Sequence, residues 1–553
     1  MMLASGPKLK TALVLNSFAQ PAWINRIVRL ISASSFAEMC LVIKIDCPPR
    51  GVRATDNTGF CATALRQASS IVDSQSKLAY PDPLEQSNIL ENFEKPAVIT
   101  VETVLEGQSL HLTGEAVRTI RAYDIDVVLD FGDWPLTGSA PGIAKHGVWR
   151  GTPLGTGENG QPAGGFWEVM KAIPTMEFGL RVMKPNSLQD RLIYRSFTSA
   201  DLYSVKGTQS KVYWKSASAV LRCLEHLHAR GPSYLENGSI VPAAPSSDSS
   251  LESLPTSWNS FVFLTKIAGR KIARTIRNSY SMERWYLAFT FGESPLVTNE
   301  SEKFKYMIPP KDVFWADPFP VAKNGRYYVF IEEFVYATMK GHISVIEMEP
   351  DGTWKPPLKV LDTDYHLSYP FVFEWEGNVY MIPESKRNKT VELYRCVEFP
   401  SQWRLEKILI ENIQAVDSTL YLHEGTWWLF CNIGGNEFSS NDELHVFYAD
   451  TPFGPWTAHR DNPVKSDVRS SRPAGRLFHW NGDLHRPSQD CSLRMGGAMC
   501  INRIEELSKK RFREREVARI EPSWKRGLLG THTLNSSGNL HVLDCFDYTP
   551  KFL

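Results

Sequence analysis

The sequence VAKNGRYYVFIEE (321–333) contains an apolar strand, a polar turn with a glycine, and a second strand rich in aromatic residues. Glycine provides the positive φ angle that such a hairpin turn requires. The pattern recurs four more times at intervals of roughly 50 residues, a spacing that suits a four-stranded blade. The further copies are VFEWEGNVYMIPE (372–384), LYLHEGTWWLFCN (420–432), LFHWNGDLHRPSQ (477–489) and TLNSSGNLHVLDC (533–545). We therefore predict an all-β, five-bladed β-propeller over residues 285–553.

A solenoid of similar period is the main alternative architecture. It would need a helix or a shorter rung in each repeat. No segment of helical length and periodicity interrupts the first three copies. The pattern therefore favours the propeller.

Residues at equal offsets from the turn glycines should form rings, because the first strand of each blade lines the central channel of a propeller. Buried polar groups need partners, so we expect the polar members to hydrogen-bond one another, water or a ligand. The first ring, before the glycines, is Asp317, Tyr369, Asp417, Ala474 and Gly530. The second ring, after them, is Glu332, Glu384, Asn432, Gln489 and Cys545.

The carboxylates of these rings are candidate catalytic residues. In glycoside hydrolysis one acid protonates the leaving oxygen and a second carboxylate activates water or attacks the sugar. Asp317, Glu384 and Asp417 stand near apolar aromatic residues, which would raise a carboxyl pKa. The alternative is that some of them are structural and tie neighbouring blades together.

Two motifs carry a family resemblance: WADPF opens the first blade and VDSTLY opens the third. They resemble the five-bladed propellers of glycoside hydrolase families 43 and 32. This resemblance implies that Asp317 is the general base and that Asp417 tunes the acid. The general acid of those families is a Glu that opens the fourth blade, where this chain has SSRPAGRLF (470–478) with no carboxylate. Glu384 is then the remaining candidate for the acid.

A longer set of motifs, including HLSYPFVF, YMIPES, RPAGRLF, RPSQDCS and GTHTL, covers roughly 310–545. It resembles the propeller at the N-terminus of plant glucosamine inositolphosphorylceramide transferases. The resemblance implies a glycan-related role in which the propeller binds rather than cleaves. Arg472, Arg476 and Arg486 could then hold a phosphate or uronate, because guanidinium matches planar oxyanions. The predicted substrate-binding residues are Glu332, Tyr369, Arg472, Arg486, Gln489, Asp490 and His532.

The first 235 residues are predicted to form an α/β domain with a doubly wound sheet. Leu9–Asn16 and Met39–Asp46 are short apolar runs, and apolar residues at helical spacing lie between them. Such strands, apolar on both faces, are typical of parallel sheets covered by helices on both sides. Asp126–Phe131 is predicted to be another central strand.

Residues 145–196 resemble the N-terminal domain of formyltransferases that use formyltetrahydrofolate, on the segments GGFWEV and LIYRS. The resemblance implies formyltetrahydrofolate as cofactor and an amino sugar as acceptor. Arg150 and Thr152 stand where that family has Asn and His, and Leu188 stands where it has Asp. The resemblance therefore supports the fold more than the reaction. The N-terminal site residues implied are His146, Arg150, Thr152 and Asp190.

The segment 236–284 is predicted to be a Ser- and Pro-rich linker followed by a basic amphipathic helix at 259–278. Its apolar residues, including Phe261 and Ile272, are spaced to oppose its lysines and arginines. Such a helix can lie on a membrane surface. The simpler alternative is that it packs against a domain and leaves its basic face in solvent.

The composition excludes some classes of function. The 61 Lys and Arg balance the 61 Asp and Glu, which argues against a broad nucleic-acid-binding face. The 9 Cys are scattered, no secretory signal or membrane span is recognised, and we expect a cytoplasmic protein with reduced thiols. The His residues show no metal-binding spacing. A calcium ion near His532 is conceivable but nothing demands it, so no metal is predicted.

The hypothesis that follows is a carbohydrate-active protein that makes or modifies a glycan or glycolipid, with a sugar bound at the propeller channel. One alternative is an N-formyl or N-acyl transferase that acts on an amino sugar. Another is a non-catalytic glycan-binding or scaffold protein. The 16 Trp suit either blade packing or sugar stacking.

Overall fold

The computed structural model describes residues 6–46, 81–93, 97–106, 109–132, 136–154, 164–183, 190–236, 239–241, 257–293, 304–435 and 439–551. The chain forms two compact units, Met1–Ile272 and Ala273–Leu553. Leu188 and most of the glycine-rich loop 155–165 lie outside the described residues.

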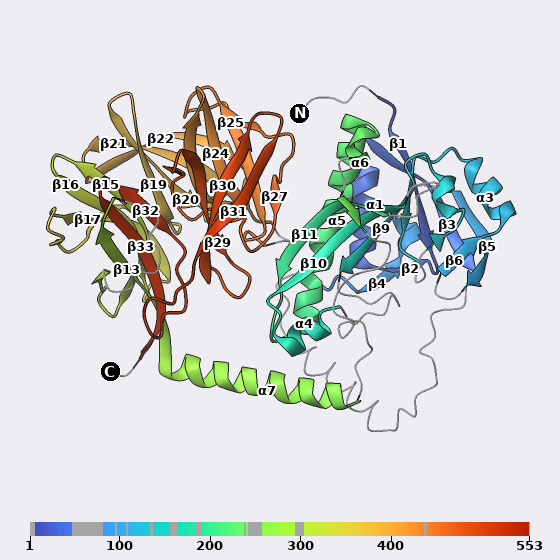
Figure 1. The fold of residues 1–553 in the computed structure, drawn as a ribbon, viewed down its shortest axis with the longest axis horizontal. Helices are drawn as coiled ribbons and strands as arrows, with labels where there is room; N and C mark the ends of the chain where they lie inside the picture. Colours follow the sequence, from blue (N-terminus) through green and yellow to red (C-terminus); the bar gives the residue numbers. More distant parts are fainter. Residues whose placement is uncertain are drawn as a thin grey trace. The chain divides into compact units, whose positions relative to one another are not determined.

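The second unit consists of five sheets, four of them with four strands and one with five, the arrangement of a five-bladed β-propeller (Figure 1). This confirms the prediction from the repeats. The first blade contains β15 (Val313–Lys323), β16 (Arg326–Val335), β17 (Lys340–Met348) and β18 (Leu358–Leu361). The second contains β19 (Ser368–Trp375), β20 (Asn378–Ser385), β21 (Thr390–Glu398) and β22 (Gln402–Glu411). The third contains β23 (Ala415–His423), β24 (Thr426–Ile433), β25 (Glu443–Ala449) and β26 (Thr457–Ala458), and β27 (Lys465–Ser466) also pairs with β25.

The last blade is shared between the two ends of the propeller sequence. The fourth blade contains β28 (Phe478–Trp480), β29 (Asp483–Asp490), β30 (Ala498–Leu507) and β31 (Phe512–Ile520). The fifth joins β32 (Leu534–Ser537) and β33 (Leu540–Pro550) to β13 (Ser281–Phe291) and β14 (Lys305–Met307). Strand β13 runs antiparallel to β33 along its whole length, from Ser281 opposite Pro550 to Phe291 opposite Leu540. This pairing closes the ring.

Most of the repeat tryptophans pack the blades. Trp315, Trp427 and Trp428 are buried, and Trp375 and Trp480 are half-buried and pack against hydrophobic clusters of the propeller. Of the two roles left open for these side chains, packing is therefore the one that the contacts support.

The first unit contains a ten-stranded mixed sheet with helices. Its central strands run parallel in the order β9, β7, β1, β3 and β5, and β10 and β11 pair antiparallel at one side. The doubly wound arrangement is a finer description and stays a prediction. The sheet strands, in chain order, are β1 (Leu9–Leu15), β3 (Ala37–Asp46), β5 (Ala97–Glu106), β6 (Ser109–Leu112), β7 (Val127–Asp130), β8 (Leu136–Thr137), β9 (Val148–Leu154), β10 (Thr175–Met183), β11 (Asp190–Ser199) and β12 (Ser239–Val241). Strands β2 (Ala19–Pro21) and β4 (Gln86–Asn88) form a separate pair.

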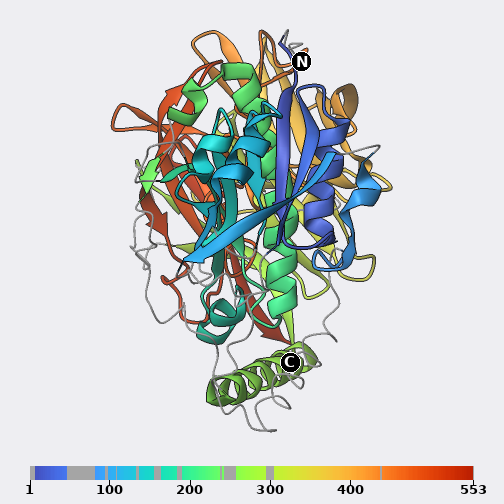
Figure 2. The same cartoon turned by 90° about the vertical axis from the view of Figure 1, so that its right-hand side faces the viewer.

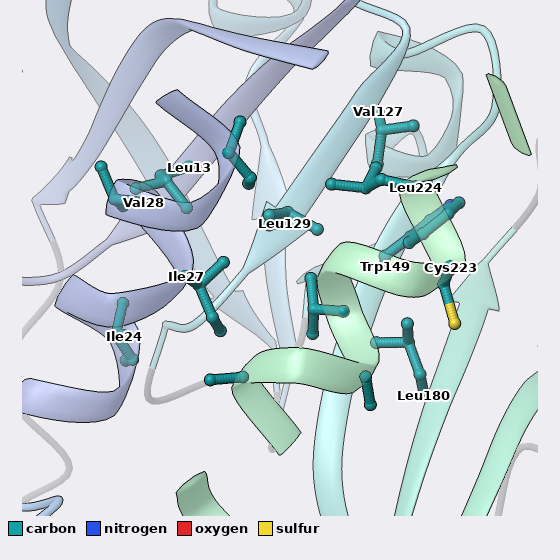
Figure 3. Close-up of a cluster of buried hydrophobic side chains, with 14 of the residues drawn as sticks. Leu13, Ile24, Ile27, Val28, Val127, Leu129, Trp149, Leu180, Cys223 and Leu224 are labelled. Carbon is teal, nitrogen blue, oxygen red and sulfur yellow. The ribbon is translucent and has the colours of Figure 1, made fainter. Parts of the chain in front are cut away.

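Two of the helices in this unit, α1 and α5, share one core. The described helices of the unit are α1 (Ala22–Ala33), α3 (Gly114–Arg121), α4 (Phe166–Lys171), α5 (Val205–Arg230) and α6 (Ser233–Glu236). Helices α1 (blue) and α5 (green) lie side by side (Figure 2). Ile27 of α1 and Leu224 of α5 point toward Leu129 and Trp149 of the sheet (Figure 3). A second cluster, which includes Val117 and Ile120 of α3, packs on other residues of the strands.

Helix α7 (Ser257–Tyr280) confirms that the basic segment is helical. Its buried side chains are Phe263 and Ile267, which pack with Val169 of the first unit. Phe261 and Ile272, which were expected on the face opposite the basic residues, are exposed. No helix in the described part of the chain is long and apolar enough to cross a membrane.

Candidate functional site

The first predicted ring is built on a backbone irregularity that repeats in three blades. The pairing between the first and second strands shifts register just after Ala316, Ser368 and Val416. The next residues, Asp317, Tyr369 and Asp417, have φ angles of 51°, 43° and 54°. Non-glycine residues rarely adopt this conformation, and such bulges re-aim side chains. Because three blades share the bulge, the ring prediction holds there. Glu332, Glu384 and Asn432 lie directly opposite the residues that precede the bulges.

Asp317 is buried and has several partners in the fifth blade and the second. Its carboxylate accepts hydrogen bonds from Thr533 Oγ1 at 2.7 Å and from the Tyr369 backbone N–H at 3.2 Å. His532 Nε2 lies 3.2 Å away, and Nδ1 of the same ring lies 2.6 Å from Asp544 Oδ2. Burial opposes ionisation of Asp317, but His532 and Thr533 outweigh it and lower the pKa of this carboxyl.

Asp417 is held by a side chain from the fourth blade. Arg472 donates from Nε at 2.6 Å and from its terminal nitrogen at 3.2 Å to the two oxygens of Asp417. Gln489 Nε2 donates to Asp417 at 2.7 Å. The other terminal nitrogen of Arg472 donates to Asn441 Oδ1 at 2.9 Å. Both oxygens of Asp417 are therefore occupied by protein donors, and the charge of Arg472 is neutralised.

Glu384 differs from both aspartates because one of its oxygens accepts no hydrogen bond. Oε2 is buried and accepts none within the described residues, and it forms a longer ion pair with Arg472 at 3.7 Å. Burial and the charge of Asp417 raise the pKa of Glu384 to about 8. The fold therefore favours the protonated form of Glu384, and a protonated carboxyl can both donate and accept a hydrogen bond.

Glu332 and two basic residues complete the polar environment of Glu384. Burial and the charge of Asp317 raise the pKa of Glu332 well above its ordinary value. His366 Nε2 lies 3.4 Å from Glu332 Oε1, and burial lowers the pKa of His366 to about 4. Burial likewise lowers the pKa of Lys386. We call Glu332, His366, Glu384, Lys386 and Arg472 the channel cluster.

The remaining predicted residues of the propeller have structural partners. Tyr369 OH lies 2.8 Å from Thr419 Oγ1 and accepts the Gly475 N–H. Asp490 forms an ion pair with Arg519. Arg476 donates to the backbone carbonyls of Pro320 and Val372, so it links the fourth blade to the first and second.

Arg486 is the most deeply buried of the three arginines proposed to hold an anion. Only 1% of its surface is exposed, and it donates to both carboxylate oxygens of Glu514 at 2.8 and 2.7 Å. It also donates to the backbone carbonyls of Ser470 and Ser471. These contacts leave it less suited to a ligand than the channel cluster.

Asp317, His532 and Asp544 come close enough together to form a set of metal ligands. The three groups also pair with one another. Burial opposes protonation of His532, yet the carboxylates of Asp544 and Asp317 outweigh it and raise the pKa of His532 well above its ordinary value. A metal ion binds the neutral imidazole, so metal binding here would release this proton.

The N-terminal site residues lie along neighbouring strands but not at one point. Arg150 on β9 donates to Asp130 Oδ2 at 2.7 Å and to the Gly132 carbonyl at 3.0 Å. The backbone of Thr152 lies opposite Gly179 of β10, whereas Asp190 begins β11 beside Arg191, which lies opposite Val182. Burial raises the pKa of Asp190. His146 precedes β9, and its carbonyl accepts from Trp149 Nε1. Formyl transfer stays a prediction.

Five contributors to the propeller site were not predicted. Asp544 and Thr533 stand next to positions that were considered, Cys545 and His532, and an acid within the apolar run HVLDCF was the available signal. His366, Lys386 and Asn441 lie in connections between strands of the repeats. These residues are not at the fixed distances from the turn glycines that were used to predict the rings.

The propeller also matches known proteins in sequence. Residues 293–540 match the family described as "Glucosamine inositolphosphorylceramide transferase 1, N-terminal". The relative of that name from Oryza sativa subsp. japonica is 39% identical over 205 residues, which are 36% of this chain and 27% of the relative. The relative from Arabidopsis thaliana is 39% identical over 208 residues, 37% of this chain and 27% of its own length. The chain thus spans about a quarter of these relatives.

Solved structures with a similar arrangement are glycoside hydrolases. The family 117 glycoside hydrolase Zg3597 of Zobellia galactanivorans has 13% identity, covers 48% of this chain and 90% of its own, and has a TM-score of 0.32. A thermostable family-43 glycoside hydrolase has 13% identity, covers 40% and 83%, and has a TM-score of 0.31.

Proposed function

We propose that the protein is carbohydrate-active and serves in the synthesis or modification of a glycolipid, and that its propeller binds a sugar at the channel cluster. The match of residues 293–540 to a family named for a glucosamine inositolphosphorylceramide transferase supports the substrate class. That segment contains the whole channel cluster. The match covers only 27% of the Oryza sativa relative, so the activity of that whole protein is not assigned to this chain.

The single observation that carries the proposal is the buried Oε2 of Glu384, which accepts no hydrogen bond within the described residues. Buried polar atoms in native proteins nearly always have a hydrogen-bond partner, and exceptions call for a water, ion or ligand. The Glu384 side chain as a whole is 11% exposed, although Oε2 itself is buried, so a ligand would reach the exposed part of the carboxyl first. A sugar hydroxyl suits this carboxyl, because it can donate to one oxygen and accept from the protonated other.

The contacts of the two aspartates favour binding over hydrolysis. A general base needs an oxygen that is open to water and a pKa near the working pH. Asp317 has a lowered pKa, and both of its oxygens accept from protein groups. Asp417 is held by Arg472 and Gln489. Glu384 could serve as an acid, but the described residues offer it no well-placed base. Non-hydrolytic sugar binding is therefore the mode that we propose.

The test is a titration of the full chain with glucosamine and with inositol phosphate, the polar components in the relatives' name. Glu384→Ala should weaken binding at least tenfold, and Glu384→Gln about threefold, because one good hydrogen bond is worth ~1 kcal/mol. Glu374→Gln is the matched control, since Glu374 is an exposed carboxylate paired with Lys323. Binding that is unchanged in Glu384→Ala would refute the site.

Hydrolysis is checked separately with Asp317→Asn. If the wild type releases reducing sugar from a glycoside and this variant does not, the site is hydrolytic and the binding-only mode is wrong. Sugar binding by both proteins without release supports the proposal.

A further inference from the structure

One face of helix α7 carries large exposed apolar side chains near both of its ends. Trp258 and Phe261, and then Ile272, Ile276 and Tyr280, stand at the three- and four-residue spacing that places side chains on one helix face. Trp258 is 69% exposed, Ile272 60%, Ile276 55% and Tyr280 67%. The smaller Thr265 and Ala268 lie between the two groups on the same face and are also exposed. Scattered exposed apolar residues need no explanation, but large ones that gather on one face mark an interaction surface, and we call this face the stripe.

The stripe is distinct from the face that the fold already uses. Phe263 and Ile267 are buried with Val169 on the other side of the helix. Arg270, on that side too, donates to the backbone carbonyls of Val169 and Leu202 at 2.6 and 2.9 Å. The helix therefore has one face that is committed to its own protein and a second apolar face that the described contacts leave exposed.

The charges on α7 indicate the chemistry of its partner. Between Ser257 and Tyr280 there are Lys266, Arg270, Lys271, Arg274 and Arg277, and no Asp or Glu. Lys266 and Arg274 are exposed, and Lys271 is half-buried. At 3.6 residues per turn, Lys266 and Lys271 flank the stripe on its two sides. An apolar stripe with Trp and Tyr, bordered by cations without an acid, complements an anionic membrane surface.

We propose that α7 is a peripheral membrane-binding helix that lies in the interface of an anionic bilayer, with the stripe toward the acyl chains. A helix of this length is roughly 36 Å long, and no described helix is apolar enough to span the bilayer. The two flanking lysines, Lys266 and Lys271, contact lipid phosphates. This inference rests on α7 alone and stands or falls independently of sugar binding at the propeller.

The experiment is a flotation assay of the full chain with phosphatidylcholine vesicles that contain phosphatidylserine, and with phosphatidylcholine vesicles alone. We expect the wild type to float with the anionic vesicles and to bind neutral ones at least tenfold more weakly. Ile272→Gln/Ile276→Gln should lose most of the binding while keeping helix propensity. Val397→Gln is the matched control, because Val397 is 63% exposed on β21; it should bind like the wild type.

A second variant addresses the charges. Lys266→Gln/Lys271→Gln should weaken binding to anionic vesicles by about tenfold or more, since each basic residue near such a surface contributes roughly fivefold, and raised salt should act in the same direction. Equal flotation of the wild type and the isoleucine variant, or no flotation of the wild type, would overturn the proposal. So would light scattering that shows a dimer converted to monomer by the stripe variant, because the stripe would then bind a second copy.

Discussion

Two arginines, one in each unit, form an ion pair with an aspartate. Arg472 of the propeller pairs with Asp417. Arg150 of the first unit pairs with Asp130. The same kind of pair has different consequences in the two regions.

The difference lies in what surrounds each pair. Asp130 also accepts from the backbone N–H groups of Gly132 and Leu136, so the pair ties together the segment that follows β7. In the propeller, Arg472 also lies 3.7 Å from Oε2 of a third group, Glu384, and this oxygen accepts no hydrogen bond within the described residues. A buried acid that lacks a hydrogen-bond partner beside an ion pair favours a ligand-binding role. An ion pair whose polar atoms all have hydrogen-bond partners needs only a structural role to explain it.

The largest effect should come from breaking the buried pair of the propeller. Arg472→Met leaves the charge of Asp417 buried with Gln489 as its remaining side-chain donor, and we expect a loss of about 3–5 kcal/mol of stability. Urea unfolding of the full chain, with hydrogen exchange of peptides from β23 and β29, measures this loss. The double variant Asp417→Asn/Arg472→Met removes both charges and should recover a large part of it. A loss below 1 kcal/mol in the single variant would contradict the role of the pair.

The corresponding change in the first unit should cost less. Arg150→Met leaves Asp130 with two backbone donors, and the Arg150 side chain is 18% exposed against 10% for Arg472. We expect a loss of about 1–3 kcal/mol, measured by hydrogen exchange of peptides from β7 and β9. If Arg150→Met proves as costly as Arg472→Met, then the distinction between the two pairs fails.

Glu384 should make the stability of the propeller depend on pH. Its pKa rises from 4.5 to about 8 on folding, so between these values the native state holds a proton that the unfolded state releases. The contribution of Glu384 to stability is present at low pH and is lost as pH rises through this window, by at most about 1.4 kcal/mol per pH unit. Glu384→Gln should remove this slope, seen as the difference between urea midpoints at pH 5 and pH 8. If the urea midpoints of the wild type and of Glu384→Gln change equally between pH 5 and pH 8, the raised pKa of Glu384 is contradicted.

The sequence was informative wherever the signal was local. The hairpins were predictable because each requires only a turn glycine and alternating side chains within a few residues. The pairing of β13 with β33 was not, because it joins Ser281–Phe291 to Leu540–Pro550, and no local pattern specifies such a distant partner. The predicted start of the propeller at 285 accordingly falls inside β13.

The candidate site was likewise predictable only where the signal was local. Equal offsets located Asp317, Tyr369 and Asp417 because their blades share one bulge. In the last two blades the ring positions are Ala474 and Gly530, and the polar groups come instead from Arg472 and His532. Counting from the glycine fails there, and only packing shows which side chains meet. The buried face of α7 was not predicted for a similar reason. Helical periodicity shows which residues share a face, but it does not show which face packs against the protein.

The smallest effect is expected at Asp190, a predicted residue of the N-terminal site. Its pKa is raised mainly by burial, and the nearby charge of Arg181 only partly offsets this. Asp190→Asn removes a partly desolvated charge, so stability at pH 7 should rise slightly, within about 0.5 kcal/mol. Because the backbone of Thr152 lies opposite Gly179 in the middle of β10, whereas Asp190 lies at the Met183 end, the variant should also leave any affinity of the full chain for formyltetrahydrofolate unchanged. A titration that shows folate binding in the wild type and its loss in Asp190→Asn would reverse the comparison, because the first unit would then hold a reactive site and Arg150 would border it.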